Sequence, residues 1–242
     1  TVKESGITAE VTALAVAPPV HAQQKIKVGL MLPYTGTYAQ LGAAITNGFK
    51  LAVDEAGGRV AGREIEYVSL DDESDPAKAA DNANRIVTRD KVDVLVGTVH
   101  SGVQAGMVKI ARETGVLHII PNAGLDAATG PLCAPNIFRT SFANGQVAYP
   151  MGKVLAERGL KNVVTLTWKY AAGDESVAGF KDAFTKGGGK IIKDLTLPFP
   201  NVYCSDTTMT TTVASAPARF PTYTIDQFRA IWPGVTLRLA QA

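Results

Sequence analysis

Residues 92–124 read VDVLVGTVHSGVQAGMVKIARETGVLHIIPNAG, and this stretch decides the fold class. The β-branched run at 92–96 predicts a buried strand, and the run at 116–120 predicts a second one. Between them, residues from about 101 to 114 have the spacing of a helix. A strand, a helix and a strand in this order predict two neighbouring parallel strands joined by a right-handed crossover.

The same alternation extends in both directions along the chain, which predicts the α/β class with Rossmann-like parallel sheets covered on both faces. The short segment 136–139 fits either a strand or a hinge. Further strands are expected at 26–32, 64–70, 162–167 and 190–197, and further helices near 41–56, from Pro76 onward, near 147–155 and near 177–184.

A Pro- and Gly-rich stretch at 121–135 divides the chain into two lobes. We expect the first α/β lobe at 25–140 and a second, incomplete lobe at 141–200. Residues 201–242 have a different texture, with one glycine, no lysine or glutamate and a Thr-rich run at 206–213. We expect a divergent, poorly packed tail there, and its composition suggests translation in another reading frame.

The first 24 residues are either the remnant of an export signal or a disordered leader. An apolar run at 11–20 precedes Val20-His21-Ala22, a small-x-small pattern typical of signal-peptidase sites. The residues upstream carry one lysine and two glutamates in place of a basic region.

Composition excludes several function classes. The 242 residues hold 24 Lys and Arg against 22 Asp and Glu, a net charge of +2, which argues against nucleic acid as a partner. No apolar run approaches the roughly 18 residues of a membrane span, so no direct membrane insertion is expected. Cys133 and Cys204 fit neither a disulfide framework nor a zinc site. The first strand-to-helix turn, 33–42, lacks the glycine patterns of dinucleotide and phosphate loops, so we expect no nucleotide cofactor.

Four carboxylates gather in residues 71–75, just before Pro76. Their spacing does not match a calcium loop. The prediction is that Asp75 caps the helix that Pro76 opens, and that no metal is bound.

Two loops at neighbouring strand ends form the candidate ligand site. Val99, His100 and Ser101 follow one strand, and Ser101 is predicted as the N-cap of the next helix, where free N–H groups favour a carboxylate. The adjacent strand ends in Asn122, Ala123 and Gly124, whose small side chains allow close approach. Tyr38, with Tyr34, lies either over this cleft or on the surface.

His100 and Ser101 also offer the alternative of a small α/β hydrolase, although adjacent residues at a strand end usually point apart. His118 sits inside an apolar strand and is predicted to be a core residue. Catalysis is therefore not expected.

Taken together, six segments resemble the type I periplasmic binding proteins of the leucine/isoleucine/valine-binding family, over residues 25–200. They are KIKVGLMLPYTGTYAQLG (25–42), AGGRVAGREIEYVSLDDESDP (56–76), DVLVGTVHSG (93–102), IIPNAG (119–124), NIFRTS (136–141) and TWKYAAGDES (167–176).

The resemblance implies a truncated, exported, periplasmic substrate-binding component of an ABC importer, whose two lobes close on a small carboxylate and whose partner is a membrane permease. It places the carboxylate at Ser101 and Asn122 to Gly124, and an aromatic residue of the second lobe over the ligand. The position of that aromatic holds Ala172 here, and Tyr170, two positions away, is the candidate for the role. Gly124 stands where the family often has a threonine, whose hydroxyl would bond an amino acid's head group. The combination of Tyr34, Tyr38, Trp168 and Tyr170 resembles the branch that binds aromatic acids, so the expected ligand is a branched-chain amino acid or an aromatic acid, with the aromatic acid favoured. A periplasmic sensor of the same fold is the alternative.

Overall fold

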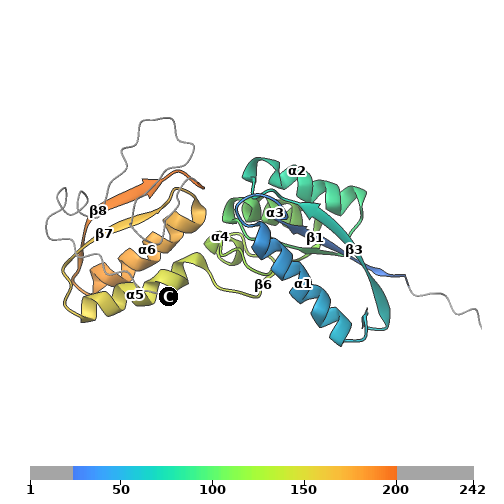
Figure 1. Ribbon diagram of the computed structural model, residues 1–242, viewed down its shortest axis with the longest axis horizontal. Helices are drawn as coiled ribbons and strands as arrows, with labels where there is room; N and C mark the ends of the chain where they lie inside the picture. The colour runs from blue at the N-terminus through green and yellow to red at the C-terminus, as the bar shows by residue number, and fades with distance from the viewer. Residues whose placement is uncertain (1–23, 201–242) are drawn as a thin grey trace, which may run out of the picture.

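The computed structural model describes residues 24–200, which form two α/β lobes (Figure 1). The first lobe contains a six-stranded sheet in the order β2-β3-β1-β4-β5-β6. All neighbours pair in parallel except β2, which is antiparallel to β3. The strands are β1 (Ile26–Leu32), β2 (Arg59–Val60), β3 (Arg63–Asp71), β4 (Val94–Val96), β5 (Leu117–Ile120) and β6 (Ile137–Arg139). The predicted fold class is confirmed, and 136–139 supplies a strand.

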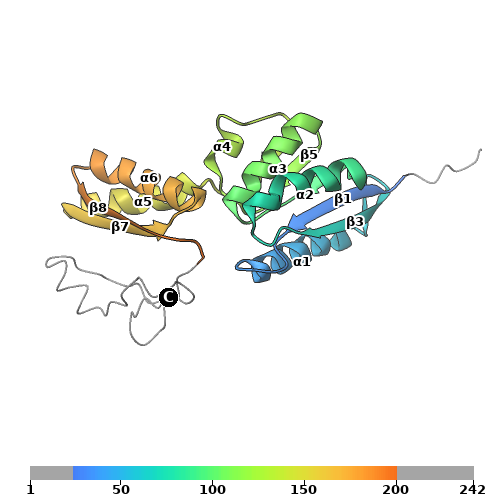
Figure 2. The same ribbon diagram turned by 90° about the horizontal axis from the view of Figure 1, so that it is seen from above.

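Helices cover both faces of this sheet, as Figure 2 shows: α1 (Ala39–Glu55) lies on one face, and α2 (Ala79–Asn84) and α3 (Ser101–Thr114) on the other. Central strand β1 is apolar and almost completely buried over its last five residues, as expected for a strand enclosed by two helical layers. The sheet can therefore hold the loops at its carboxyl edge in fixed positions.

The helix expected from Pro76 onward is divided into three pieces: a 3₁₀ turn at Pro76–Lys78, α2, and a π turn at Arg85–Arg89. Asp75 caps it as predicted, since its Oδ1 accepts from the N–H of Ala77 at 2.9 Å. The apolar spacing alone could not show the change in helix type.

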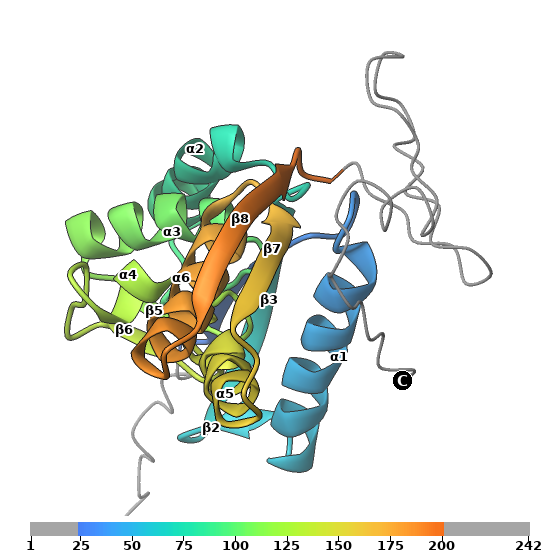
Figure 3. The ribbon, with the colours of Figure 1, turned by 90° about the vertical axis from the view of Figure 1, so that its left-hand side faces the viewer.

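The second lobe consists of β7 (Asn162–Trp168) and β8 (Lys190–Leu197), a parallel pair, with α5 (Asn144–Glu157) and α6 (Ala171–Lys186) packed side by side on one face (Figure 3). Phe180 and Phe184 stack at 5.5 Å beneath the strands. Leu166 and Ile192 are 58% and 52% exposed. The described part of this sheet has two strands against six in the first lobe, in line with the expected incomplete lobe.

Residues 140–143 connect the lobes, and a short helix, α4 (Asp126–Thr129), lies between β5 and β6 of the first lobe. The predicted leader (1–24, apart from Gln24), the predicted tail (201–242) and Cys204 lie outside the described residues. Within residues 24–200, no helix has both the length and the apolarity needed to cross a membrane.

Candidate functional site

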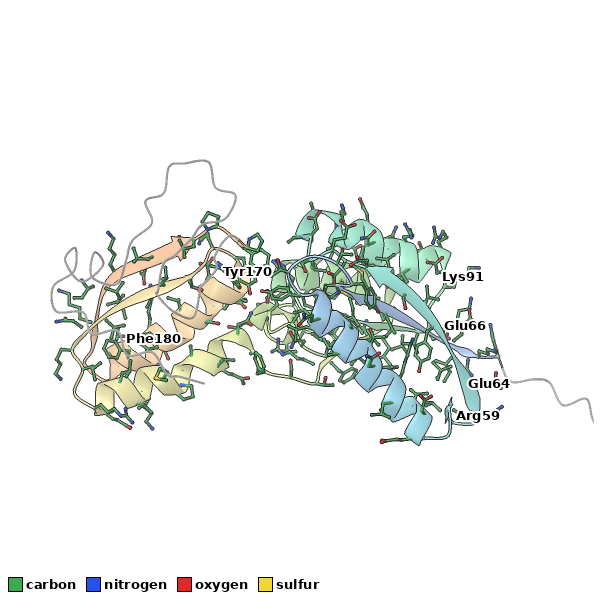
Figure 4. All side chains as sticks on the ribbon, viewed as in Figure 1. Arg59, Glu64, Glu66, Lys91, Tyr170 and Phe180 are labelled. Carbon is green, nitrogen blue, oxygen red and sulfur yellow. The ribbon has the colours of Figure 1, made fainter. Side chains whose placement is uncertain are left out.

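The carboxyl ends of β1, β4 and β5 open on the side of the first lobe that faces the second lobe. Tyr38 follows β1 and directly precedes α1, Val99 and His100 follow β4, and residues 122–124 follow β5. Ligands of open α/β sheets bind at this edge. From the other lobe, Tyr170 lies between β7 and α6 at the end that points toward the first lobe (Figure 4).

His100, and not Ser101, is the N-cap of α3, so the predicted cap was wrong by one residue. The ring Nδ1 of His100 accepts from the N–H of Gly102 at 3.0 Å, and Ser101 is already helical. The imidazole of His100 is 3% exposed, and burial lowers its pKa against the opposing effect of Asp75. A neutral ring whose Nδ1 is occupied by the backbone suits packing against other rings, and it leaves that nitrogen unavailable as a base.

Ser101 is turned away from solvent and toward the second lobe. It is 2% exposed, and its Oγ accepts from Nδ2 of Asn144, the first residue of α5, at 3.1 Å. The same Nδ2 donates to Oε2 of Glu175 at 2.7 Å. In this arrangement the Ser101 hydroxyl bonds the amide of Asn144, and its role in binding a ligand stays a prediction.

The loop at 122–124 lies against the same asparagine. Gly124 accepts from the N–H of Asn144 through its carbonyl at 2.8 Å, and Ala123 donates its N–H to Thr98 at 2.9 Å. The Asn122 carbonyl accepts from Ser141 Oγ at 3.1 Å. A Cβ on Gly124 would come within 2.2 Å of Asn144 Oδ1, so a threonine does not fit here beside Asn144. The close contact with Asn144 of the second lobe thus explains why position 124 holds a glycine and not the threonine common in the family.

Four rings from the two lobes form an aromatic cage, defined as Tyr38, His100, Trp168 and Tyr170. The His100 and Tyr170 rings lie 4.9 Å apart, Tyr38 and His100 6.2 Å, and Trp168 and Tyr170 6.5 Å. The hydroxyl oxygens of Tyr38 and Tyr170 are 3.0 Å apart. Burial and this hydrogen bond raise the pKa of Tyr38, so its phenol is neutral at physiological pH.

A fifth ring, Phe199, lies among the four. Its centroid is 4.9 Å from those of His100 and Tyr170, 5.2 Å from Trp168 and 5.7 Å from Tyr38. The sequence analysis missed Phe199, and also Asn144 and Glu175. Only the position of Phe199, two residues beyond a predicted strand end, could have suggested its place at this edge.

Beneath the site, a buried polar chain joins β3, β4, α3 and β5. The Thr98 hydroxyl donates to the carboxylate of Asp72, and burial raises the pKa of this carboxyl. The N–H of Thr98 donates to Gln104 Oε1 at 3.3 Å. Gln104 Nε2 lies 2.7 Å from His118 Nε2, and His118 Nδ1 is 3.0 Å from the Leu95 carbonyl. A carbonyl only accepts, so Nδ1 carries the proton and Nε2 accepts from Gln104.

His118 is fully buried, as predicted, and burial lowers its pKa to about 4. Every bond of the chain is satisfied with the ring neutral. The chain holds Thr98, and hence the turn that carries His100, in place.

Tyr34 lies elsewhere: its hydroxyl bonds Thr46 Oγ1 at 2.9 Å, and its ring packs on the core beneath α1. Two of the four carboxylates in residues 71–75 accept hydrogen bonds from nearby groups. Asp71 accepts from the N–H and the hydroxyl of Thr35, and Asp72 accepts from the N–H of Ser74. Within residues 24–200, no group of three His, Cys, Asp or Glu residues is arranged to hold a metal ion.

Two lobes with facing strand ends, joined by a short connection and carrying a shared ring cage, define a two-domain ligand-binding protein. A sequence model described as periplasmic binding protein matches residues 25–212. The chain belongs to this family.

Solved and curated relatives agree with this assignment. A solute-binding protein of an ABC transporter from R. palustris, solved with benzoate, is 56% identical with a TM-score of 0.71, over 74% of this chain and 49% of that one. A second, from Rhodopseudomonas palustris BisB5 with 3,4-dihydroxybenzoic acid, is 36% identical with a TM-score of 0.67, over 72% and 47%. The Leu/Ile/Val-binding protein BraC3 of Rhizobium johnstonii is 32% identical, over 78% of this chain and 51% of the relative. The chain spans about half the length of the curated relatives that it matches.

Proposed function

We propose that this chain is the ligand-binding part of an ABC importer's substrate-binding protein, and that its ligand is a small aromatic carboxylate. The observation that carries the proposal is the aromatic cage, because its rings come from both lobes and lie beside the first turn of α3. Aromatic rings stack on or meet one another edge to face, and the backbone N–H groups of a helix's first turn favour a carboxylate.

An aromatic acid fits these residues better than a branched-chain amino acid. Stacking on Tyr170 or His100 needs a π system, which an aliphatic side chain lacks. The solved relative with the higher identity holds benzoate, which supports the same choice. Closure of the lobes would place the ring between Tyr38 and Tyr170, with the carboxylate directed at residues 99–101 and 122–124.

Binding without catalysis is the second part of the proposal. The hydrolase alternative needs the His100 ring to activate Ser101, but His100 Nδ1 accepts from Gly102 and Ser101 Oγ accepts from Asn144. Both solved relatives described above are solute-binding proteins of ABC transporters, which supports binding over catalysis. We place the protein in the periplasm, with a membrane permease as its partner.

Calorimetric titration of the 242-residue chain with four compounds tests the proposal. Benzoate should bind. Cyclohexanecarboxylate should bind about two- to twelvefold more weakly because it cannot stack, since an aromatic pair contributes about 0.5–1.5 kcal/mol. Benzamide should also bind more weakly, since a hydrogen bond to a charged group is worth about 1.5–3 kcal/mol. Leucine binding as tightly as benzoate, or no difference between benzoate and cyclohexanecarboxylate, would refute the aromatic ligand.

A further inference from the structure

Phe199 lies where it does because the two strands of the second lobe end side by side. Trp168 is the last residue of β7 and pairs with Leu197, the last residue of β8. The N–H of Lys169 donates to the Leu197 carbonyl at 2.8 Å, which keeps the two chains together beyond the sheet. Phe199 therefore leaves the sheet at the same edge as Trp168 and Tyr170.

The contacts of Phe199 are those of a ring held in an aromatic site. Its plane is inclined by 36° to Tyr170 and by 34° to Tyr38, which are tilted contacts. It meets Trp168 at 87° and His100 at 71°, which are edge contacts. Rings of both lobes thus surround one six-membered ring on several sides.

The ring of Phe199 has the size and the apolar character of the ring of benzoate. The Tyr38 and Tyr170 hydroxyls meet beside it, so the two lobes are joined around the phenyl group. A second ring has no place among the same four neighbours while Phe199 stays, because aromatic contacts at these distances leave no layer between the rings.

We propose that Phe199 is an internal occupant of the aromatic cage, which accepts one six-membered aromatic ring, and that an aromatic carboxylate binds by displacing it. The identity of the external ligand rests on the proposed function. The occupancy of the cage by Phe199 rests only on the ring contacts given above. Phe199 thereby sets the affinity of the site, since every ligand ring competes with it.

The test compares the full-length wild type with Phe199→Ala, using two probes. Toluene is a bare ring without a carboxylate, and it reports on the cage alone. Benzoate reports on the cage together with the carboxylate site. Phe138→Ala is the matched control, because Phe138 is a half-exposed phenylalanine on β6, outside the cage.

We expect toluene to raise the melting temperature of Phe199→Ala and to leave the wild type and Phe138→Ala unchanged. We expect benzoate to bind Phe199→Ala at least about fivefold more tightly than the wild type. Phe199→Leu keeps apolar bulk without a π face, so its binding of both probes should be intermediate between the wild type and Phe199→Ala. It replaces the alanine variant in the test if that variant does not fold.

Two results would overturn the proposal: no toluene binding by either folded variant, or weaker benzoate binding after the substitution, which would make Phe199 a wall of the site. A third result separates the two ideas. If toluene binds Phe199→Ala while benzoate binds neither protein, the aromatic carboxylate is wrong and the internal occupant stands.

Discussion

The phenolic oxygens of Tyr38 and Tyr170 lie 3.0 Å apart, although 132 residues separate the two tyrosines in the chain. One belongs to the turn after the first strand and the other to the second lobe, so this hydrogen bond exists only when the lobes approach each other. It couples the aromatic cage to the relative position of the lobes.

Replacing Tyr38 by phenylalanine keeps the ring and removes the cross-lobe hydrogen bond. We expect benzoate to bind about two- to tenfold more weakly, since one hydrogen bond contributes about 0.5–1.5 kcal/mol net and the closed arrangement loses that stabilisation. Calorimetry measures the change. Tyr34→Phe is the control, because its hydroxyl bonds Thr46 within the first lobe. Equal losses in both variants would contradict a specific role for Tyr38.

Replacing Asn144 by alanine removes one amide that donates to both Ser101 and Glu175. We expect the free energy of unfolding to fall by about 1.5–3 kcal/mol, because one acceptor is a carboxylate. Ser101→Ala loses a single neutral bond and should cost about 0.5–1.5 kcal/mol. Asn144→Asp should destabilise more than alanine does, since it sets two carboxylates face to face. Urea denaturation ranks the three variants by their free energy of unfolding. If Asn144→Ala is as stable as the wild type, this account is refuted.

Adding a methyl group at Gly124 tests the steric fit between the lobes. The Cβ of Gly124→Ala would lie 2.2 Å from Asn144 Oδ1, so we expect a destabilisation of about 1–3 kcal/mol. Combining it with Asn144→Ala should recover part of this loss. Gly48→Ala is the control, because nothing lies within 4 Å of that Cβ on α1, and it should stabilise by about 0.5–1 kcal/mol. Chemical denaturation measures the free energy of unfolding of both variants. If Gly124→Ala is as stable as the wild type, the lobes do not meet at this residue.

Acidification should destabilise the first lobe through His118. Its pKa is lowered to about 4 in the folded chain against 6.5 in the unfolded one, so the unfolded chain binds more protons between these values. The contribution of neutral His118 is fully present above pH 6.5 and is lost as the pH falls toward 4. The lowered pKa of His118 corresponds to a contribution of about 3 kcal/mol to the free energy of unfolding. Asp72, whose pKa is raised, acts in the opposite sense.

The difference between the wild type and His118→Gln isolates the histidine from Asp72. The variant's unfolding free energy, measured from pH 7 to pH 4, should fall less steeply than that of the wild type. Parallel curves would mean that His118 does not titrate in this range.

The sequence predicts the first lobe well because its signals are local. Apolar β-branched runs identify β1, β3, β4 and β5, and Asp75 before Pro76 identifies a capped helix start. Strand β2, two exposed residues long, has no such signal, since only its pairing with β3 makes it a strand.

The site is harder to predict because its contacts are long-range. His100 is the cap because its ring Nδ1 accepts from the N–H of Gly102 and Ser101 is already helical, whereas residue preferences alone favour serine. Asn144 and Phe199 enter the site only through the meeting of two lobes. No spacing in the chain encodes that meeting, so Asn144 could not be singled out beforehand, and for Phe199 only its position just beyond a predicted strand end gave a signal.

Tyr38, Tyr170 and Phe199 lie in loops and Trp168 is the last residue of β7, so each of these rings stands at the end of an element. Exchanging the side chain at residue 38, 168 or 170 of the aromatic cage, or at residue 199 among its rings, therefore alters the site and leaves the strands beneath it intact. The rings of the site can therefore be substituted one at a time while the scaffold stays folded.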